Sequence, residues 1–195
     1  MAGGAILSAL RHLCGHMTEP LRDLAIRTGR DSDTGTILAI INAAAQAYRG
    51  VIPDDCWTDP YMSVADLTKE LADGVQFHLA MMGGQVVGVM GIQDKGGVAL
   101  VRHAYVRPSS RGQGIGSALL RHLQSLTAKP LLVGTWAASV WAVRFYQSHG
   151  FRLMSQATKD ELLCRYWSVS PRQRETSVVL AGPGWPAPHG QVFAP

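Results

Sequence analysis

A glycine-rich turn ahead of an amphipathic stretch is the feature of this sequence best suited to chemistry. It reads Arg-Gly-Gln-Gly-Ile-Gly from Arg111 to Gly116. Glycines let the backbone turn tightly and approach a ligand closely, and the first turn of a helix leaves amide hydrogens without intrahelical partners. Together with the Arg111 guanidinium, these amides would bind an anion such as a phosphate group.

Two common phosphate-binding motifs do not fit this turn. A dinucleotide fingerprint has a different glycine spacing and an acidic residue roughly 20 residues further on, whereas the next acid here is Asp160. The GK[ST] ending of ATP- and GTP-binding loops is missing as well. The turn therefore predicts a phosphorylated ligand of another class.

Positive charge is concentrated in the segment that contains the turn. Residues 95–159 hold nine Lys and Arg and no Asp or Glu, so the other residues, with nine bases and fourteen acids, carry −5 while the whole chain carries +4. The bases are spread among apolar residues instead of being clustered on one polar face, which argues against nucleic-acid binding. We expect a small phosphorylated ligand and no nucleic acid.

The composition predicts a single folded domain. The chain has 195 residues, of which 47% are hydrophobic and 16% charged, values far from those of disordered chains. Its longest largely apolar run, residues 37–47, is too short to span a membrane, and residues 1–17 make a poor secretory signal. We expect a cytoplasmic protein with a flexible leader at 1–19, a domain at 20–181 and a disordered Pro- and Gly-rich tail at 182–195.

The three cysteines are predicted to be reduced thiols without a metal. Cys14, Cys56 and Cys164 lie far apart, and no CxxC pair or nearby histidine has metal-ligand spacing. A buried or incidental thiol is the interpretation that this spacing favours.

The elements that must position the turn follow from periodicity and capping signals. A short strand at 24–27 precedes a helix that begins at Asp33 or Thr34 and ends near Gly50, and Ser63 with Asp66 opens a second helix that stops at Gly74. Residues 75–106 predict three consecutive antiparallel strands. The remaining elements are a helix at 115–126, a strand at 131–136, a helix at 140–149, strands at 151–154 and 176–180, and a helix or turn at 158–167 between them. This order indicates an α+β (mixed α/β) three-layer domain around one sheet.

Two segments resemble the motifs of a known family. VRPSSRGQGIGSALLRHL, residues 106–123, is similar to the central motif of the GNAT N-acetyltransferase superfamily: a strand ending in a V-x-P-like turn, then Arg or Gln, two residues, Gly, one residue, and Gly or Ala. WAASVWAVRFYQSHGF, residues 136–151, resembles the later helix of that family, with its FY pair and terminal GF. The resemblance covers roughly residues 20–180 and implies a mostly antiparallel central sheet flanked by helices.

The resemblance also implies the donor and its contacts. Acetyl-CoA would be the cosubstrate, with its diphosphate on the amides of residues 112–117, its pantetheine beside the strand near Tyr105 and Val106, and no metal. Ser139 stands where the family often has Asn, and it could still cap the helix and contact the cofactor. The cofactor-binding residues expected on this basis are Tyr105, Val106, Arg111, Gly112, Gln113, Gly114, Ile115, Gly116, Ser117 and Ser139.

Acetyl transfer to an amine needs a neutral nucleophile and a proton for the departing thiolate. Tyr146 matches the family tyrosine that can supply that proton, and the alternative is that it only seals its helix against the sheet. His103 is the first candidate for the general base. Asp94 or an acid of the 53–61 loop is the other candidate, and a purely structural role for His103 stays open.

The loop from Val51 to Tyr61 is expected to line the acceptor pocket. Its acids, Asp54, Asp55 and Asp59, would suit a cationic amine or would simply be solvated, while Trp57 and Tyr61 could contact the acceptor. Three further tryptophans, Trp136, Trp141 and Trp167, are expected in the core or at an interface because their neighbours are apolar.

Two functions remain open at this point. The first is an enzyme that acetylates an amine of a small molecule or a protein, and the second is a noncatalytic CoA-binding regulatory module. The aromatic residues near the C-terminus also allow a homodimer.

Overall fold

Seven strands form one sheet in the computed structural model, which describes residues 23–186. The order across the sheet is β1-β2-β3-β4-β5-β7-β6, and β4 and β5 are the only parallel neighbours among them. The strands are β1 (Ala25–Thr28), β2 (Gln76–Met82), β3 (Gln85–Asp94), β4 (Ala99–Val106), β5 (Leu131–Trp136), β6 (Arg152–Leu153) and β7 (Ser177–Ala181). The predicted mixed fold with a mostly antiparallel sheet is confirmed.

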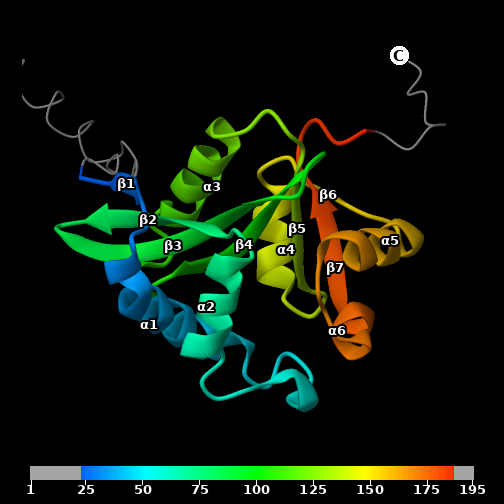
Figure 1. The fold of residues 1–195 in the computed structure, drawn as a ribbon, viewed down its shortest axis with the longest axis horizontal. Helices are drawn as coiled ribbons and strands as arrows, with labels where there is room; N and C mark the ends of the chain where they lie inside the picture. Colours follow the sequence, from blue (N-terminus) through cyan, green and yellow to red (C-terminus); the bar gives the residue numbers. More distant parts are fainter. Residues whose placement is uncertain (1–22, 187–195) are drawn as a thin grey trace, which may run out of the picture.

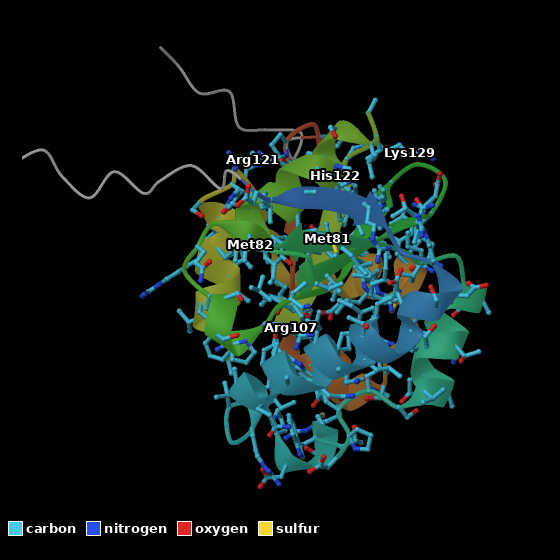
Figure 2. All side chains as sticks on the ribbon, turned by 90° about the vertical axis from the view of Figure 1, so that its left-hand side faces the viewer. Met81, Met82, Arg107, Arg121, His122 and Lys129 are labelled. Carbon is cyan, nitrogen blue, oxygen red and sulfur yellow. The ribbon has the colours of Figure 1, made fainter. Side chains whose placement is uncertain are left out.

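Helices cover both faces of this sheet. They are α1 (Thr34–Ala45), α2 (Val64–Ala72), α3 (Ile115–Ser125), α4 (Val140–Gln147), α5 (Gln156–Tyr166) and α6 (Pro171–Thr176). Figure 1 shows α3 on the side of the sheet opposite α1 and α2. Figure 2, viewed from the β1 end, shows the same layers, with His122 of α3 above the strands and α1 below them.

The apolar spacing of the sequence accounts for the buried helix faces. Ile37, Ile40 and Ile41 of α1 are at most 2% exposed, and they pack with the α2 residue Leu67 on one face of β2 and β3. On the other face, α3 buries residues at the same three- and four-residue steps, among them Ile115 and Leu119. A third apolar cluster lies under α5 and contains Leu162 and Leu163.

Capping residues set the beginning of α2 as predicted. The Ser63 hydroxyl accepts a hydrogen bond from the Asp66 amide at 3.1 Å, and the Asp66 carboxylate accepts one from the Ser63 amide at 3.0 Å. The same device, Ser170 with Gln173, opens α6, a helix that the sequence analysis missed. Its six residues are too few for periodicity to reveal.

The domain extends beyond the boundary expected at residue 181. The Gly182 amide donates to the Leu131 carbonyl at 2.8 Å, and the Arg152 guanidinium donates to the Trp185 carbonyl at 2.9 Å. Trp185 also packs against the cluster under α5. The start of the predicted tail, through Trp185, is therefore part of the folded domain, while residues 187–195 of the tail and the predicted leader at 1–19 lie outside the described residues.

No helix between residues 23 and 186 combines the length and the apolar character that crossing a membrane requires.

Candidate functional site

The two parallel strands separate in the middle of the sheet. Ala99–Val101 of β4 pair with Leu131–Val133 of β5, and beyond these residues both strands continue without pairing to each other. A cavity of about 980 Å³ occupies this region, and the ends of α1, α3 and α4 that face it also line it. The parting of β4 from β5 thus gives a ligand access to the centre of the sheet.

A β-bulge in β4 lies at the point where the strands part. Two residues of β4, His103 and Ala104, face the single residue Met90 of β3, and His103 has a positive φ of 48°. Bulges interrupt the hydrogen-bond ladder and redirect side chains, and they occur often beside active sites. Here the side chains of the consecutive residues Arg102 and His103 both reach the same residue of α2, Glu70.

Glu70, Arg102 and His103 form a compact ionic cluster. Arg102 Nη2 lies 2.7 Å from Glu70 Oε1 and 2.6 Å from Oε2, and His103 Nε2 lies 3.1 Å from Oε2. All three side chains are between 16% and 22% exposed. Burial alone would raise the pKa of Glu70, but the contact with His103 and the charges of His103 and Arg102 bring this pKa below its ordinary value. Glu70 is therefore a carboxylate held against His103.

The glycine-rich turn has the backbone geometry of an anion site. Gly112 and Gly114 have φ values of 76° and 79°, which favour glycine, and α3 begins at Ile115 without a side-chain cap. The amides of residues 112–117 donate no hydrogen bond to any described part of the chain. Unpaired amides at a helix start attract negative charge, so this turn fits the diphosphate of a nucleotide-like ligand.

Arg111 extends across the cavity from this turn. Its Nη2 donates to the Ala44 carbonyl at the end of α1 at 3.1 Å, and its other guanidinium hydrogens stay available. The third glycine differs from the first two: Gly116 lies inside α3, where a Cβ would only come within 3.5 Å of Phe145.

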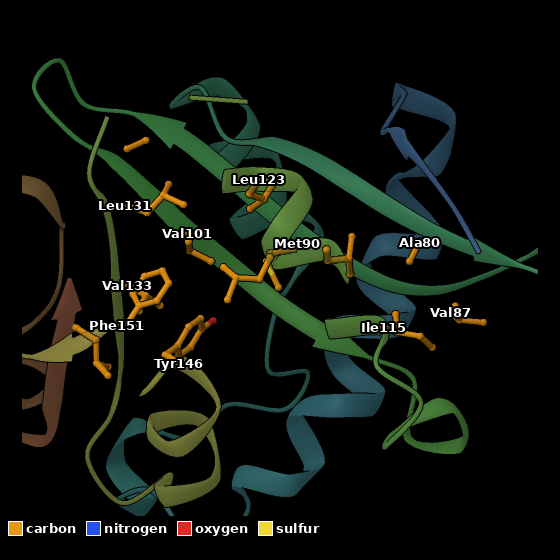
Figure 3. Packing of buried hydrophobic residues seen from close by; sticks show 14 residues of the cluster. Ala80, Val87, Met90, Val101, Ile115, Leu123, Leu131, Val133, Tyr146 and Phe151 are labelled. Atoms are coloured by element: carbon orange, nitrogen blue, oxygen red, sulfur yellow. The ribbon is translucent and has the colours of Figure 1, made fainter. Parts of the chain in front are cut away.

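Tyr146 reaches the cavity from α4, which packs on the same face of the sheet as α3. Its ring is 4% exposed and packs between Phe145 and Phe151, with ring centroids 5.1 and 5.5 Å away. Figure 3 shows the hydroxyl directed away from α4 toward the strands. Burial raises the pKa of Tyr146 above its ordinary value, with a smaller contribution from Tyr48, so the phenol stays protonated at neutral pH.

Aromatic rings line much of the cavity. Tyr48 stacks on Tyr61 at 5.9 Å and on Trp141 at 5.7 Å, and the edge of Tyr105 lies 6.3 Å away. The indole of Trp136 donates to the Tyr61 hydroxyl at 3.2 Å. Burial raises the pKa of Tyr48 to about 12 and that of Tyr105 well above its ordinary value, so both phenols are neutral.

Three tryptophans that the sequence predicts in the core or at an interface also contribute to the cavity wall. Trp136 is buried, as expected, but Trp136, Trp141 and Trp167 all line the cavity as well. Trp141 is 47% exposed, at the rim. The strands and helices carry these rings to one place from segments that are far apart in the sequence.

The acids considered as bases or acceptor contacts point elsewhere. Asp94 pairs with Lys129 Nζ, 2.7 Å from its Oδ1. In the 51–61 loop, Asp55 lies 3.1 Å from Arg172, and Asp59 lies 3.9 Å from Arg49. None of these acids, nor Asp54, lines the cavity, and neither does Trp57, which stacks on Tyr61 at 5.5 Å. Of the bases considered, the cavity contains His103.

Most of the expected cofactor-binding residues lie around the cavity. Two do not line it: Gln113 is exposed, and Ser139, the N-cap residue of α4, is fully buried. The expectation that the Ser139 side chain caps this helix is wrong, because its hydroxyl makes no capping hydrogen bond. The lining residues are Tyr105, Val106, Arg111, Gly112, Gly114, Ile115, Gly116 and Ser117. Their binding roles stay predictions.

Glu70 is the polar residue that sequence reasoning missed. Its signal was available, because Glu70 follows the buried Leu67 by three residues, which puts both on the inner face of α2. As for metals, residues 23–186 contain no group of three or more His, Cys, Asp and Glu positioned to hold an ion.

Comparisons with known proteins agree with this geometry. The family model for the acetyltransferase (GNAT) domain matches residues 42–164, whereas the comparison with curated proteins gave no match. Among solved structures, the PaiA N-acetyltransferase of Thermoplasma acidophilum, in complex with coenzyme A, is 15% identical, with a TM-score of 0.62 over 82% of this chain and 98% of that one. The ribosomal-protein-S18-alanine N-acetyltransferase of Escherichia coli is 17% identical, with a TM-score of 0.59 over 87% and 99%. A GNAT-family acetyltransferase of Staphylococcus aureus Mu50 is 18% identical, with a TM-score of 0.61 over 82% and 98%. At these identities the structures show a shared fold.

Proposed function

The chain belongs to the acetyltransferase (GNAT) family, and we propose that it transfers the acetyl group of acetyl-CoA to an amine by direct attack on the thioester. One observation carries the proposal: a single cavity connects the uncapped start of α3 with the His103 side chain and with Tyr146. A site for a diphosphate and two groups that can move protons therefore share one space. The CoA complex of the Thermoplasma acidophilum structure supports the same donor.

The turn before α3 would hold the cosubstrate. The free amides of residues 112–117 and the α3 dipole meet a diphosphate, and Arg111 adds a full positive charge beside them. Tyr105 and Val106 line the path from this turn toward His103. When bound, acetyl-CoA supplies the thioester carbonyl that the amine attacks.

His103 would take the proton from the incoming ammonium. Its Nε2 faces the Glu70 carboxylate at 3.1 Å, which favours the tautomer with hydrogen on Nε2 and leaves the lone pair on Nδ1 as the basic atom. Glu70 stabilises the imidazolium that forms. Glu70 acts through the histidine and is thus a positioning residue in this proposal.

Tyr146 would serve the leaving group. As the amine nitrogen bonds to the carbonyl carbon, the carbon–sulfur bond breaks and negative charge develops on sulfur. The Tyr146 hydroxyl donates its proton to that sulfur, and the acylated nitrogen then releases its surplus proton, which restores the phenol. The raised pKa of the phenol keeps the proton on Tyr146 until negative charge develops on sulfur.

Release of free thiol from acetyl-CoA in the presence of amines tests this function. We expect thiol release that depends on both protein and amine, with acetyl-amine as the second product. A noncatalytic CoA-binding module would instead be stabilised against heat by acetyl-CoA and would release no thiol with any amine. That result would overturn the enzyme proposal.

A further inference from the structure

One part of the cavity is an aromatic chamber. We use this name for Tyr48, Tyr61, Tyr105, Trp136 and Trp141, which line the cavity and contact one another as described above. They come from the segment after α1, the 51–63 loop, β4, β5 and α4. Rings from five separate segments therefore line one part of the cavity.

The chamber contains no negative charge. No Asp or Glu is among the residues of 23–186 that line the cavity. The loop acids that might have reached it are in ion pairs with Arg172 and Arg49, and Glu70 lies behind Arg102 and His103. The described wall therefore offers no carboxylate to pair with the additional positive charge of a diamine or polyamine acceptor.

Among the described residues that line the cavity, neither arginine is free for an acidic acceptor once the diphosphate is bound. Arg102 is already engaged by Glu70 and by Gln93, whose Oε1 accepts from Nη1 at 2.7 Å. Arg111 belongs to the phosphate turn and reaches the Ala44 carbonyl. An amino acid would place its carboxylate among neutral phenols and indoles, where no free cation pairs with it.

We infer that the acceptor is a small monoamine with a flat, apolar, ring-bearing substituent. This inference rests on the proposed function and specifies its second substrate. Aromatic faces attract an ammonium group through the ring quadrupole, which would bring the protonated amine to His103 without a carboxylate in the wall. The substituent would stack against the rings at the spacings usual for aromatic pairs.

A panel of four amines tests the inference, with thiol release from acetyl-CoA as the readout. The panel holds 2-phenylethylamine, spermidine, lysine and a peptide with a free N-terminal alanine. We expect kcat/KM for 2-phenylethylamine to exceed each of the others by about twofold to tenfold, the effect of one good ring contact. If spermidine, lysine or the peptide equals or exceeds it, acetyl transfer stands and the acceptor inference fails. If no amine is acetylated, the proposed function itself fails, and the inference with it.

Ring removal provides a second, independent readout. Tyr48→Leu deletes the central ring, and Tyr48→Phe keeps it without the hydroxyl. We expect the ratio of kcat/KM for 2-phenylethylamine to that for methylamine to fall about tenfold in Tyr48→Leu and to persist in Tyr48→Phe. Because Trp141 is 47% exposed, Trp141→Leu is a further variant that should fold, and it should lower the same ratio. A ratio unchanged in both ring-deleting variants would overturn the inference.

Discussion

Replacing Tyr146 by phenylalanine isolates the chemical part of its role from the structural part. The ring is 4% exposed and packs against Phe145 and Phe151, and phenylalanine keeps those contacts. No described group accepts a hydrogen bond from the hydroxyl, so its removal leaves no buried partner unsatisfied. We therefore expect Tyr146→Phe to fold with wild-type stability.

The expected loss of rate follows from the protonation state of the phenol. Burial keeps the pKa of Tyr146 above its ordinary value, so at neutral pH the hydroxyl always carries its proton. A positioned acid contributes about 100-fold to 10,000-fold to rate. A phenol with a raised pKa gives up its proton less readily, which places the effect at the lower end: about 100-fold in kcat, or about 2.7 kcal/mol.

Steady-state thiol release and calorimetric titration with acetyl-CoA separate the two roles. We expect kcat to fall about 100-fold while the Kd for acetyl-CoA changes by less than about threefold, because the interaction forms mainly as sulfur departs. Tyr166→Phe is the matched control, since Tyr166 is a tyrosine of α5 that does not line the cavity. A kcat within about twofold of wild type would remove Tyr146 from the mechanism. An equal loss in kcat and in affinity would show a role in binding instead.

Three further predictions address the turn, the ionic cluster and a buried histidine pair. Gly112→Ala strains a backbone with φ 76° and should weaken CoA binding about tenfold. Gly96→Ala is the control, because Gly96 has the same φ and equal space for a Cβ, and it should lower only the stability of the fold. If calorimetry gives the two variants equal Kd values for CoA, the turn does not bind the cofactor. Glu70→Gln keeps the size of the side chain and removes the carboxylate beside His103 Nε2, so kcat should fall about tenfold while the Kd for acetyl-CoA stays within about threefold. An unchanged kcat would refute the positioning role. His78 is 3% exposed, and burial together with His122 lowers its pKa to about 4. Between about pH 6.5 and 4 the unfolded chain therefore binds a proton at His78 that the folded chain does not. The free energy of unfolding should fall by about 3 kcal/mol as the pH falls from about 6.5 to 4. Urea unfolding should show a shallower acid dependence in His78→Gln, and parallel curves would contradict this assignment.

Local signals made the glycine-rich turn predictable from the sequence. The left-handed glycines at 112 and 114, the capping box at Ser63 and the apolar spacing of α3 each depend on residues a few positions apart. Such features follow from backbone sterics and helix periodicity, which the sequence displays directly. The family motif then connected the turn with Tyr146 on a different helix.

Side-chain partners from distant segments could not be read in the same way. Glu70 contacts His103 because a bulge in β4 redirects two consecutive side chains toward α2. No sequence pattern predicted this bulge. The same limit applied to the acids Asp55 and Asp94, whose partners, Arg172 and Lys129, lie 117 and 35 residues away. Only the fold shows that these carboxylates form ion pairs at the surface, away from the cavity.

Calorimetric titration of the protein with CoA, compared with pantetheine, tests the central claim most directly. Pantetheine keeps the thiol arm and lacks the 3′-phosphoadenosine diphosphate part of CoA, whose diphosphate the amides of residues 112–117 would bind. We predict one saturable site for CoA and at least about tenfold weaker binding of pantetheine, as expected when charge-assisted hydrogen bonds to a diphosphate are lost. No binding of CoA, or equal binding of the two compounds, would contradict the account.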